Sequence, residues 1–260
     1  MKIGEDANLC AAWDFQCHDG SAWPDRVAGR VLRAMHGRVV RVEMDGPQRF
    51  GRWCARIEYG GWLRVPRAEL GGLDIHGAQP WTVVAWVKHD SDRLWQFICG
   101  VWNERMKRQY ALFTHGAWAS DWRTWERRAV RARAMGYVSH GGHHTPGHPA
   151  CFSYATGGTE LRVGEWYCLA CTYDLQALRV YVNGELDECE GSNPFMYGET
   201  IYDGGVDGGD FTVAQRCYRA WEGYPEAAPP DGEGFSGWIS GIAVYRRALR
   251  GEEIRALALG

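Results

Sequence analysis

The sequence has no long apolar segment and no large excess of either charge. No stretch approaches the roughly 18 consecutive apolar residues that a membrane-spanning helix needs. The first residues, Met1 to Asp6, lack the basic and then apolar layout of a secretory signal. The formal net charge of −3 provides no global attraction to nucleic acid or to an anionic membrane. We therefore predict neither a nucleic-acid partner nor a membrane partner.

Cysteine is present in an odd number, nine, at irregular spacings. The cysteines cannot all pair within one chain, which favours a reducing compartment. As it stands, the sequence predicts a cytoplasmic protein, or a secreted one if a leader has been removed. Cys168 and Cys171 form a CxxC motif in a segment that alternates like a strand, which points them to opposite faces. This favours a structural role for the pair over a redox or zinc site.

Helical patterning is nearly absent before the last residues of the chain. The 34 glycines separate short segments rich in β-branched and aromatic residues, a pattern typical of many short strands. The predicted strands are 38–44, 52–59, 81–88, 95–101, 110–114, 165–173, 177–182, 211–215 and 237–245. We predict an all-β fold in which two antiparallel sheets pack as a sandwich. The length of 260 residues suits a single domain, 1–260.

Local signals predict some of the connections. Asn183-Gly184 between two strands favours a tight hairpin, because a type I′ turn needs positive φ at both central residues. Residues 247–257 form an amphipathic pattern typical of a short helix, with Leu249, Ile254 and Leu257 against the sandwich. Two long segments, 117–149 and 193–234, fit no strand pattern, and we predict that they are long loops.

Four blocks of sequence follow one another in a distinctive order. They are residues 50–66, the segment WTVVAWVK at 81–88, residues 164–184 and residues 235–254. Together they resemble the laminin-G-like and concanavalin A-like lectin/glucanase jelly-roll family. The resemblance implies a two-sheet jelly roll with long rim loops, which binds glycans, sometimes with calcium. The sequence departs from the family where Ser240-Gly241 replaces an acidic residue, and it lacks the ExDxxE strand of laminarinase-type glycosidases.

A histidine-rich segment is the most distinctive candidate site. Residues 136–148 contain four of the nine histidines, His140, His143, His144 and His148. Gly-Gly and Pro-Gly pairs predict a loop there, and side chains that titrate near neutrality suit a functional site. Three interpretations stay open: solvated loop residues, acid–base or sugar-binding groups, and a transition-metal site that joins His143 to His140 or His148.

A second candidate constellation lies upstream. Alternation places Arg108 and Tyr110 on one face of a strand that ends near His115. A guanidinium could grip the carboxylate of an acidic sugar while Tyr or His moves the adjacent proton, as in a polysaccharide lyase. A surface ion pair and a core tyrosine are equally consistent with this pattern. The predicted catalytic residues are His140, Tyr110, His115, Arg108 and His143.

Carboxylates support two other interpretations. A glycoside hydrolase would need two carboxylates about 5 to 10 Å apart, and no pair in the sequence has a diagnostic spacing. The candidates are Glu104, Asp121, Glu126, Asp203, Asp207 and Asp210. The last three, which glycines bracket, could wrap a calcium ion, although aspartates of this kind also form ordinary turns. Calcium is therefore a possible cofactor, and no other is predicted.

Tryptophan is abundant, with 14 residues, and sugar rings pack on aromatic faces. The predicted sugar-binding residues, in or beside the loops, are Trp102, Trp118, Trp122, Trp125 and Trp221, with Asn103, Arg105 and His144 as polar partners. The predicted core tryptophans are Trp13, Trp81, Trp86, Trp166 and Trp238.

These patterns predict a carbohydrate-active protein whose rim excursions, 102–148 and 193–234, form a groove for an oligo- or polysaccharide, acidic or neutral. Lyase-like proton abstraction by His or Tyr is favoured over hydrolysis by two carboxylates. A non-catalytic, lectin-like glycan-binding module is the main alternative. The sequence carries no signal of the oligomeric state.

Overall fold

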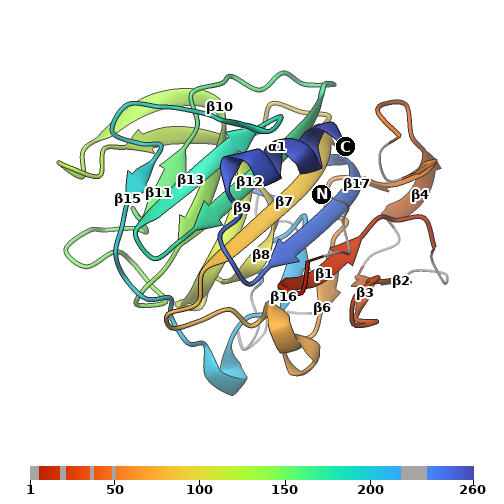
Figure 1. Cartoon of the computed structure of the whole chain (residues 1–260), viewed down its shortest axis with the longest axis horizontal. Coiled ribbons are helices and arrows are strands. Elements are labelled where there is room, and N and C mark those ends of the chain that lie inside the picture. Colours follow the sequence, from red (N-terminus) through yellow and green to blue (C-terminus); the bar gives the residue numbers. More distant parts are fainter. Residues whose placement is uncertain (1–5, 18–21, 36–37, 49–50, 218–232) are drawn as a thin grey trace.

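The computed structural model describes residues 6–17, 22–35, 38–48, 51–217 and 233–260. These residues form two antiparallel β-sheets that pack face to face, with one α-helix, α1 (Gly251–Leu259), near the C-terminus (Figure 1). The predicted all-β sandwich with a C-terminal helix is confirmed.

The first sheet has nine strands in the described part of the chain, and the long strands β7 and β17 lie at its centre. Its main path runs β14 (Glu185–Leu186), β13 (Ala177–Val182), β12 (Trp166–Tyr173), β7 (Trp81–His89), β17 (Gly237–Tyr245), β5 (Trp53–Ile57) and β4 (Val39–Glu43). Two further strands, β1 (Leu9–Trp13) and β15 (Phe195–Met196), pair with β17 and β13.

The second sheet has eight described strands. Its order is β11 (Tyr154–Thr156), β10 (Arg127–Val138), β9 (Lys107–Ser120), β8 (Gln96–Asn103), β16 (Phe211–Val213), β6 (Leu63–Val65), β3 (Val31–Ala34) and β2 (Ala22–Pro24). Three single 3₁₀ turns, η1 (Arg67–Glu69), η2 (Gly71–Leu73) and η3 (Gly205–Asp207), lie in the connections.

Alternating side chains of the strands fill the space between the sheets. Along β7, Trp81 and Val83 belong to this inner core, whereas Val84 and Trp86 point to the outer face of the nine-stranded sheet. Both sets are buried, because helix α1 covers the outer face (Figure 1). This explains why β7 has an almost continuous apolar sequence rather than an alternating one.

Helix α1 packs as the sequence predicts. Ile254 and Leu257 are buried with Leu249 in one cluster that also contains Trp86 of β7. Glu253 accepts a hydrogen bond from the backbone N–H of Arg250 at 2.8 Å, which caps the first turn. Burial of each large aliphatic side chain contributes about 1.5 to 3 kcal/mol to stability.

The predicted hairpin and the predicted orientation of the CxxC pair are also confirmed. Asn183 and Gly184 have φ values of 52° and 91°. Cys168 lies in the outer cluster beneath α1, and Cys171 lies in the inner core. The nine cysteines, all among the described residues, form no disulfide.

One fold prediction was wrong. About half of the segment 117–149 is strand rather than loop, because β9 extends to Ser120 and β10 occupies Arg127–Val138. The exposed start of β10 carries charged residues, and its register with β9 shifts twice, so that simple alternation is lost. The loops that remain are residues 121–126 and 139–153.

Candidate functional site

The outer face of the eight-stranded sheet contains an aromatic pocket of about 190 Å³. Buried aromatic side chains of β8, β9, β10 and β11 form its floor: Trp102, Phe113, Tyr137 and Tyr154. Phe97 and Met135 belong to the same buried cluster. The ring of Tyr137 lies at the centre, 5.3 Å from Trp102, 5.1 Å from Phe113 and 4.7 Å from Tyr154 between centroids. These strands therefore present a continuous aromatic surface that the core does not use.

An ion-pair network lines the side of this pocket near β8. Glu104 accepts hydrogen bonds from the indole N–H of Trp102 at 2.8 Å and from Arg216 at 2.9 Å, and it also pairs with Arg108. Glu233 lies 3.0 Å from the same Nη1 atom of Arg216. The two carboxylates are thus brought close together by one guanidinium, from segments far apart in the sequence.

The side of the pocket near β11 has a different chemistry. The guanidinium of Arg127 lies over the rings of Phe152 and Trp118, 4.3 and 5.2 Å from their centroids. Tyr154 and Ser120 lie close to one another and to Arg127. Their hydroxyl groups are buried, and neither has a hydrogen-bond partner of normal geometry among the described residues. Burial raises the pKa of Tyr154, so its hydroxyl is a neutral donor at physiological pH.

The histidine-rich loop forms part of the rim. His144 and Cys151 line the pocket, and the loop is held by the backbone N–H of Phe152, which donates to the Thr145 hydroxyl at 2.8 Å. The Ser153 hydroxyl donates to the carbonyl of Val138 at 2.6 Å, which attaches the end of the loop to β10. The pocket is therefore bounded by fixed loop backbone on this side.

Tyr110 does not lie in this pocket. It is fully buried in the core between the sheets, where its hydroxyl donates to the carbonyl of Leu73 at 2.7 Å and burial raises its pKa well above 10.0. The prediction that Tyr110 and Arg108 share a face was wrong. Pairing shifts from Val101↔Tyr110 to Trp102↔Arg108, and the extra residue, Gln109, turns Arg108 onto the outer face.

His115 is also inaccessible. Its ring is 1% exposed and makes an edge-to-face contact with His89 of the opposite sheet, with centroids 4.1 Å apart. Burial lowers the pKa of His115 to about 4 and that of His89 to about 3. At neutral pH the pair is an uncharged contact between the sheets, and it is out of reach of a bound glycan.

The other predicted catalytic histidines are exposed but lie outside the pocket lining. Nδ1 of His140 is 3.1 Å from the carbonyl of Thr200, and Nδ1 of His143 is 3.1 Å from the carbonyl of His144. The structure therefore does not bring His140, His143, His115, Tyr110 and Arg108 together.

The predicted sugar-binding residues divide among several places. Trp102 and His144 line the pocket, and the exposed Trp118 flanks Arg127. Trp122 and Trp125 pack against the core, and Trp125 also contacts His148.

The predicted polar partners do not line the pocket together. Asn103 is buried, and its side chain accepts a hydrogen bond from the backbone N–H of Arg105, which is itself exposed. Trp221 lies outside the described residues. Among the predicted core tryptophans, Trp13, Trp81 and Trp86 are buried, whereas Trp166 and Trp238 are half-buried.

The three aspartates of the predicted calcium loop do not converge on one point. Asp210 is buried and accepts from the backbone N–H of Arg67 at 2.7 Å, and Asp203 accepts from the N–H of Gly205 at 2.9 Å. Asp207 lies 3.7 Å from the ammonium of Lys107. Within the described ranges, no group of three His, Cys, Asp or Glu side chains could hold a metal ion. The residues therefore fit neither calcium nor the histidine metal site.

Sequence reasoning missed several residues of the pocket. Phe113, Tyr137 and Tyr154 occupy strand positions that are hard to distinguish from core positions, because one register shift exchanges the two faces. Arg216 and Glu233 reach the pocket through long-range contacts that no local pattern encodes. A search for strands with aromatic residues on both faces would have found the first group.

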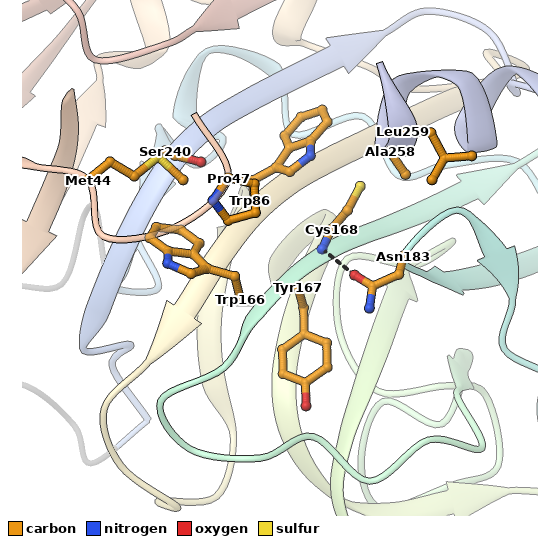
Figure 2. Close-up of a pocket in the computed structure, with 10 residues that line it drawn as sticks. All are labelled: Met44, Pro47, Trp86, Trp166, Tyr167, Cys168, Asn183, Ser240, Ala258 and Leu259. Carbon is orange, nitrogen blue, oxygen red and sulfur yellow. Dashed lines mark hydrogen bonds between the residues drawn. The ribbon is translucent and has the colours of Figure 1, made fainter. Parts of the chain in front are cut away.

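A second pocket lies on the opposite side of the molecule, on the outer face of the nine-stranded sheet beside α1 (Figure 2). Trp166 and Trp86 lie on one side of it, and Leu259 of α1 lies on the other (Figure 2). The hydroxyl of Ser240 is buried there without a hydrogen-bond partner in the described part of the chain. This pocket is smaller, about 110 Å³, and no charged side chain lines it.

Residues 61–255 match the family model of the concanavalin A-like lectin/glucanases superfamily. The chain belongs to this superfamily. The matched region includes every strand that forms the aromatic pocket. The predicted family is therefore confirmed. No curated protein matches the chain in sequence.

Several solved structures share this superfamily fold at low sequence identity. Domain 4 of AbnA, a GH43 extracellular arabinanase from Geobacillus stearothermophilus in complex with arabinotriose, has a TM-score of 0.57 and 16% identity, covering 98% of this chain and 100% of that one. A mutant Trypanosoma rangeli sialidase with trans-sialidase activity has a TM-score of 0.55 and 17% identity, over 97% of this chain and 33% of that one. The binding domain of Paraclostridial Mosquitocidal Protein 1 has a TM-score of 0.57 and 9% identity, covering 96% of this chain and 52% of that one.

In the described residues, no helix has both the length and the apolar character that a bilayer crossing requires.

Proposed function

We propose that this chain binds an oligosaccharide in the pocket on the outer face of its eight-stranded sheet, without cleaving it. The observation that carries this proposal is the combination of an aromatic floor with guanidinium, carboxylate and hydroxyl groups at the rim. Sugars need both, because their C–H faces pack on aromatic rings while their hydroxyls bind polar forks. The AbnA domain, which this chain covers in full, is a complex with arabinotriose, and this similarity supports the proposal.

Binding is favoured over lyase chemistry because the predicted catalytic residues do not meet in the pocket. Tyr110 and His115 are buried away from it, and Arg108 is already paired with Glu104. His144 is the only predicted site histidine among the described lining residues. The pocket has tyrosines of its own, Tyr137 and Tyr154, but burial raises the pKa of both, so neither hydroxyl is ready to act as a base at neutral pH.

Hydrolysis is the second candidate, and one observation favours it. Glu104 and Glu233 lie 2.9 and 3.0 Å from the same Nη1 atom of Arg216, so that their carboxylate oxygens cannot be farther apart than these two distances together. Retaining glycosidases place two carboxyl groups about 5 to 5.5 Å apart. Here, however, both carboxylates accept from guanidinium groups, whereas a general acid must hold a proton for the leaving group.

A combined binding and product assay distinguishes the two functions. Wild-type protein is titrated with a panel of oligosaccharides by calorimetry, and the same mixtures are then assayed for reducing ends and for ultraviolet absorbance of unsaturated products. We expect binding without either product. Release of reducing ends that is abolished in both Glu104→Gln and Glu233→Gln would instead establish hydrolysis. Absence of binding to every member of the panel would contradict the proposed function.

A further inference from the structure

The arginines that line the pocket differ in how their charge is balanced. Arg108 pairs with Glu104, and Arg216 pairs with Glu104 and Glu233. Arg127 is exposed and lines the same pocket, and it has no carboxylate within ion-pair distance among the described residues. Arg127 is therefore a positive charge at the pocket that the protein itself leaves unbalanced.

Arg127 is nevertheless held in place. Its guanidinium lies over the ring of Phe152 at 4.3 Å and over that of Trp118 at 5.2 Å. Contact with two aromatic rings restricts the guanidinium, while its N–H donors, which lie in the guanidinium plane, remain able to bind a ligand. A fork of this kind matches a carboxylate with two parallel hydrogen bonds.

Two hydroxyl groups beside Arg127 also lack partners. Tyr154 is 1% exposed and lines the pocket, and Ser120 pairs with Arg127 across β9 and β10. Their buried hydroxyls lie near one another and near Arg127, but neither makes a hydrogen bond of normal geometry within the described chain. A buried polar group whose hydrogen bonds are poorly formed is destabilising, because its lost bonds to water are not fully replaced. A ligand oxygen at the pocket would give these hydroxyls a better partner.

We propose that the bound sugar carries a carboxylate, and that Arg127 receives it with the hydroxyls of Tyr154 and Ser120 as neighbouring partners. This inference rests on the proposed function, because it names the class of ligand for the same pocket. The sugar ring packs on the aromatic floor, and its carboxylate binds Arg127 at the β11 side of the pocket. The guanidinium groups at the β8 side attract an anion less strongly, because Glu104 already pairs with Arg108 and Arg216.

The test compares matched ligands that differ only in charge. The probes are uronic-acid and sialic-acid oligosaccharides, each paired with its carboxyl-reduced counterpart, and a sulfated neutral oligosaccharide. Calorimetric titrations use the wild type, Arg127→Gln, Tyr154→Phe and the control Arg131→Gln. Arg131 is exposed on the same strand and lies 4.0 Å from Asp92, outside the pocket. Thermal melting of each variant verifies that it is folded.

We expect at least one acidic probe to bind the wild type tenfold or more tightly than its reduced counterpart. Arg127→Gln should remove this preference while it leaves binding of the reduced sugar unchanged, and Arg131→Gln should behave like the wild type. Equal affinity for acidic and reduced sugars, or a preference for the sulfated probe alone, would overturn this inference while leaving the proposed function intact. Absence of binding to every probe would overturn both.

Discussion

The two outer faces of the sandwich are built from similar residues but differ in how their charges are balanced. On the nine-stranded sheet, Trp166, Lys88, Trp238 and Arg56 form a row across four neighbouring strands. The ammonium of Lys88 lies 4.0 Å from the ring of Trp238, and the guanidinium of Arg56 lies 4.3 Å from the same ring. Each cation in this row also has a carboxylate partner, Asp45 for Lys88 and Asp90 for Arg56.

The eight-stranded sheet also places cations on aromatic rings, but it leaves one of them without a carboxylate. Arg127 lies over two rings and has no acidic partner in the described chain, and the hydroxyls of Tyr154 and Ser120 beside it make no hydrogen bond of normal geometry there. The comparison suggests a criterion for this fold. A face whose charges are matched internally serves stability, whereas a face whose polar groups are held in place but unmatched serves a ligand.

The largest expected effect lies on the helix-covered face. Ile254→Ala should lower the free energy of unfolding by about 2 to 5 kcal/mol, because the fully buried side chain joins α1 to the sheet and its loss leaves a cavity. Urea unfolding at pH 7 measures this change. Glycan affinity of the folded variant should equal that of the wild type, and a tenfold loss of affinity would show that the two faces are not independent.

A matched pair of tryptophans tests which face binds the sugar. Trp95 is half-buried and lines the aromatic pocket, and Trp166 is half-buried and lines the pocket beside α1. Trp95→Ala should weaken glycan binding by about 2 kcal/mol, the loss expected when a large aromatic side chain that packs on the ligand is truncated. Trp166→Ala should leave the affinity unchanged. Calorimetric titration of both variants measures this difference, and the reverse result would transfer the site to the other face.

Acid should weaken the framework that carries both faces. His89 and His115 have pKa values lowered by burial to about 3 and about 4, so they bind protons in the unfolded chain before they do so in the folded one. Their effect on stability is therefore absent above pH 6.5 and grows as the pH falls below it. We expect a loss on the order of 1 kcal/mol per histidine for each pH unit in this range.

Urea unfolding at pH 7, 6 and 5 measures this dependence. In the double variant His89→Phe, His115→Asn the slope should be reduced, because neither new side chain binds a proton in this range. Phe can keep the stacking of position 89 on Tyr167, with centroids 6.1 Å apart, and Asn accepts the positive φ of 58° at position 115. An unchanged slope would mean that other groups are responsible for the acid sensitivity.

The smallest expected effect separates two tyrosine hydroxyls. Tyr110→Phe should cost about 1 kcal/mol of stability, because it leaves the carbonyl of Leu73 without its donor. Tyr154→Phe should cost nothing or be slightly stabilising, because it removes a buried hydroxyl that has no partner among the described residues. Thermal melting of the two variants compares them. An equal loss in both would show that the Tyr154 hydroxyl already has a structural partner.

The sequence predicted the framework better than the site, for a physical reason. Strands such as β7 and β13 are rich in β-branched and aromatic residues, and the Asn183-Gly184 turn has a backbone requirement that two residues satisfy by themselves. The pocket depends instead on register. A bulge at Gln109 shifts the register of β9 and places Arg108 and Tyr110 on opposite faces of the sheet. No rule of composition or spacing reveals such a shift.

Long-range pairing set the second limit. Glu104 and Glu233 become neighbours only through Arg216, and the unmatched charge of Arg127 is visible only when the carboxylates around it are placed. The abundance of tryptophan correctly suggested surplus aromatic surface, but it could not distinguish Trp102 at the pocket from Trp125 against the core.

The most direct test of the account is a map of backbone amide shifts in nuclear magnetic resonance spectra during titration with the acidic oligosaccharide that binds most tightly. We predict that the largest shifts fall in β8, β9, β10 and β11 and in the loop 139–153, with none in α1 or β12. Shifts concentrated in α1, β12 and the Asn183 turn would place the ligand on the other sheet and contradict the central claim.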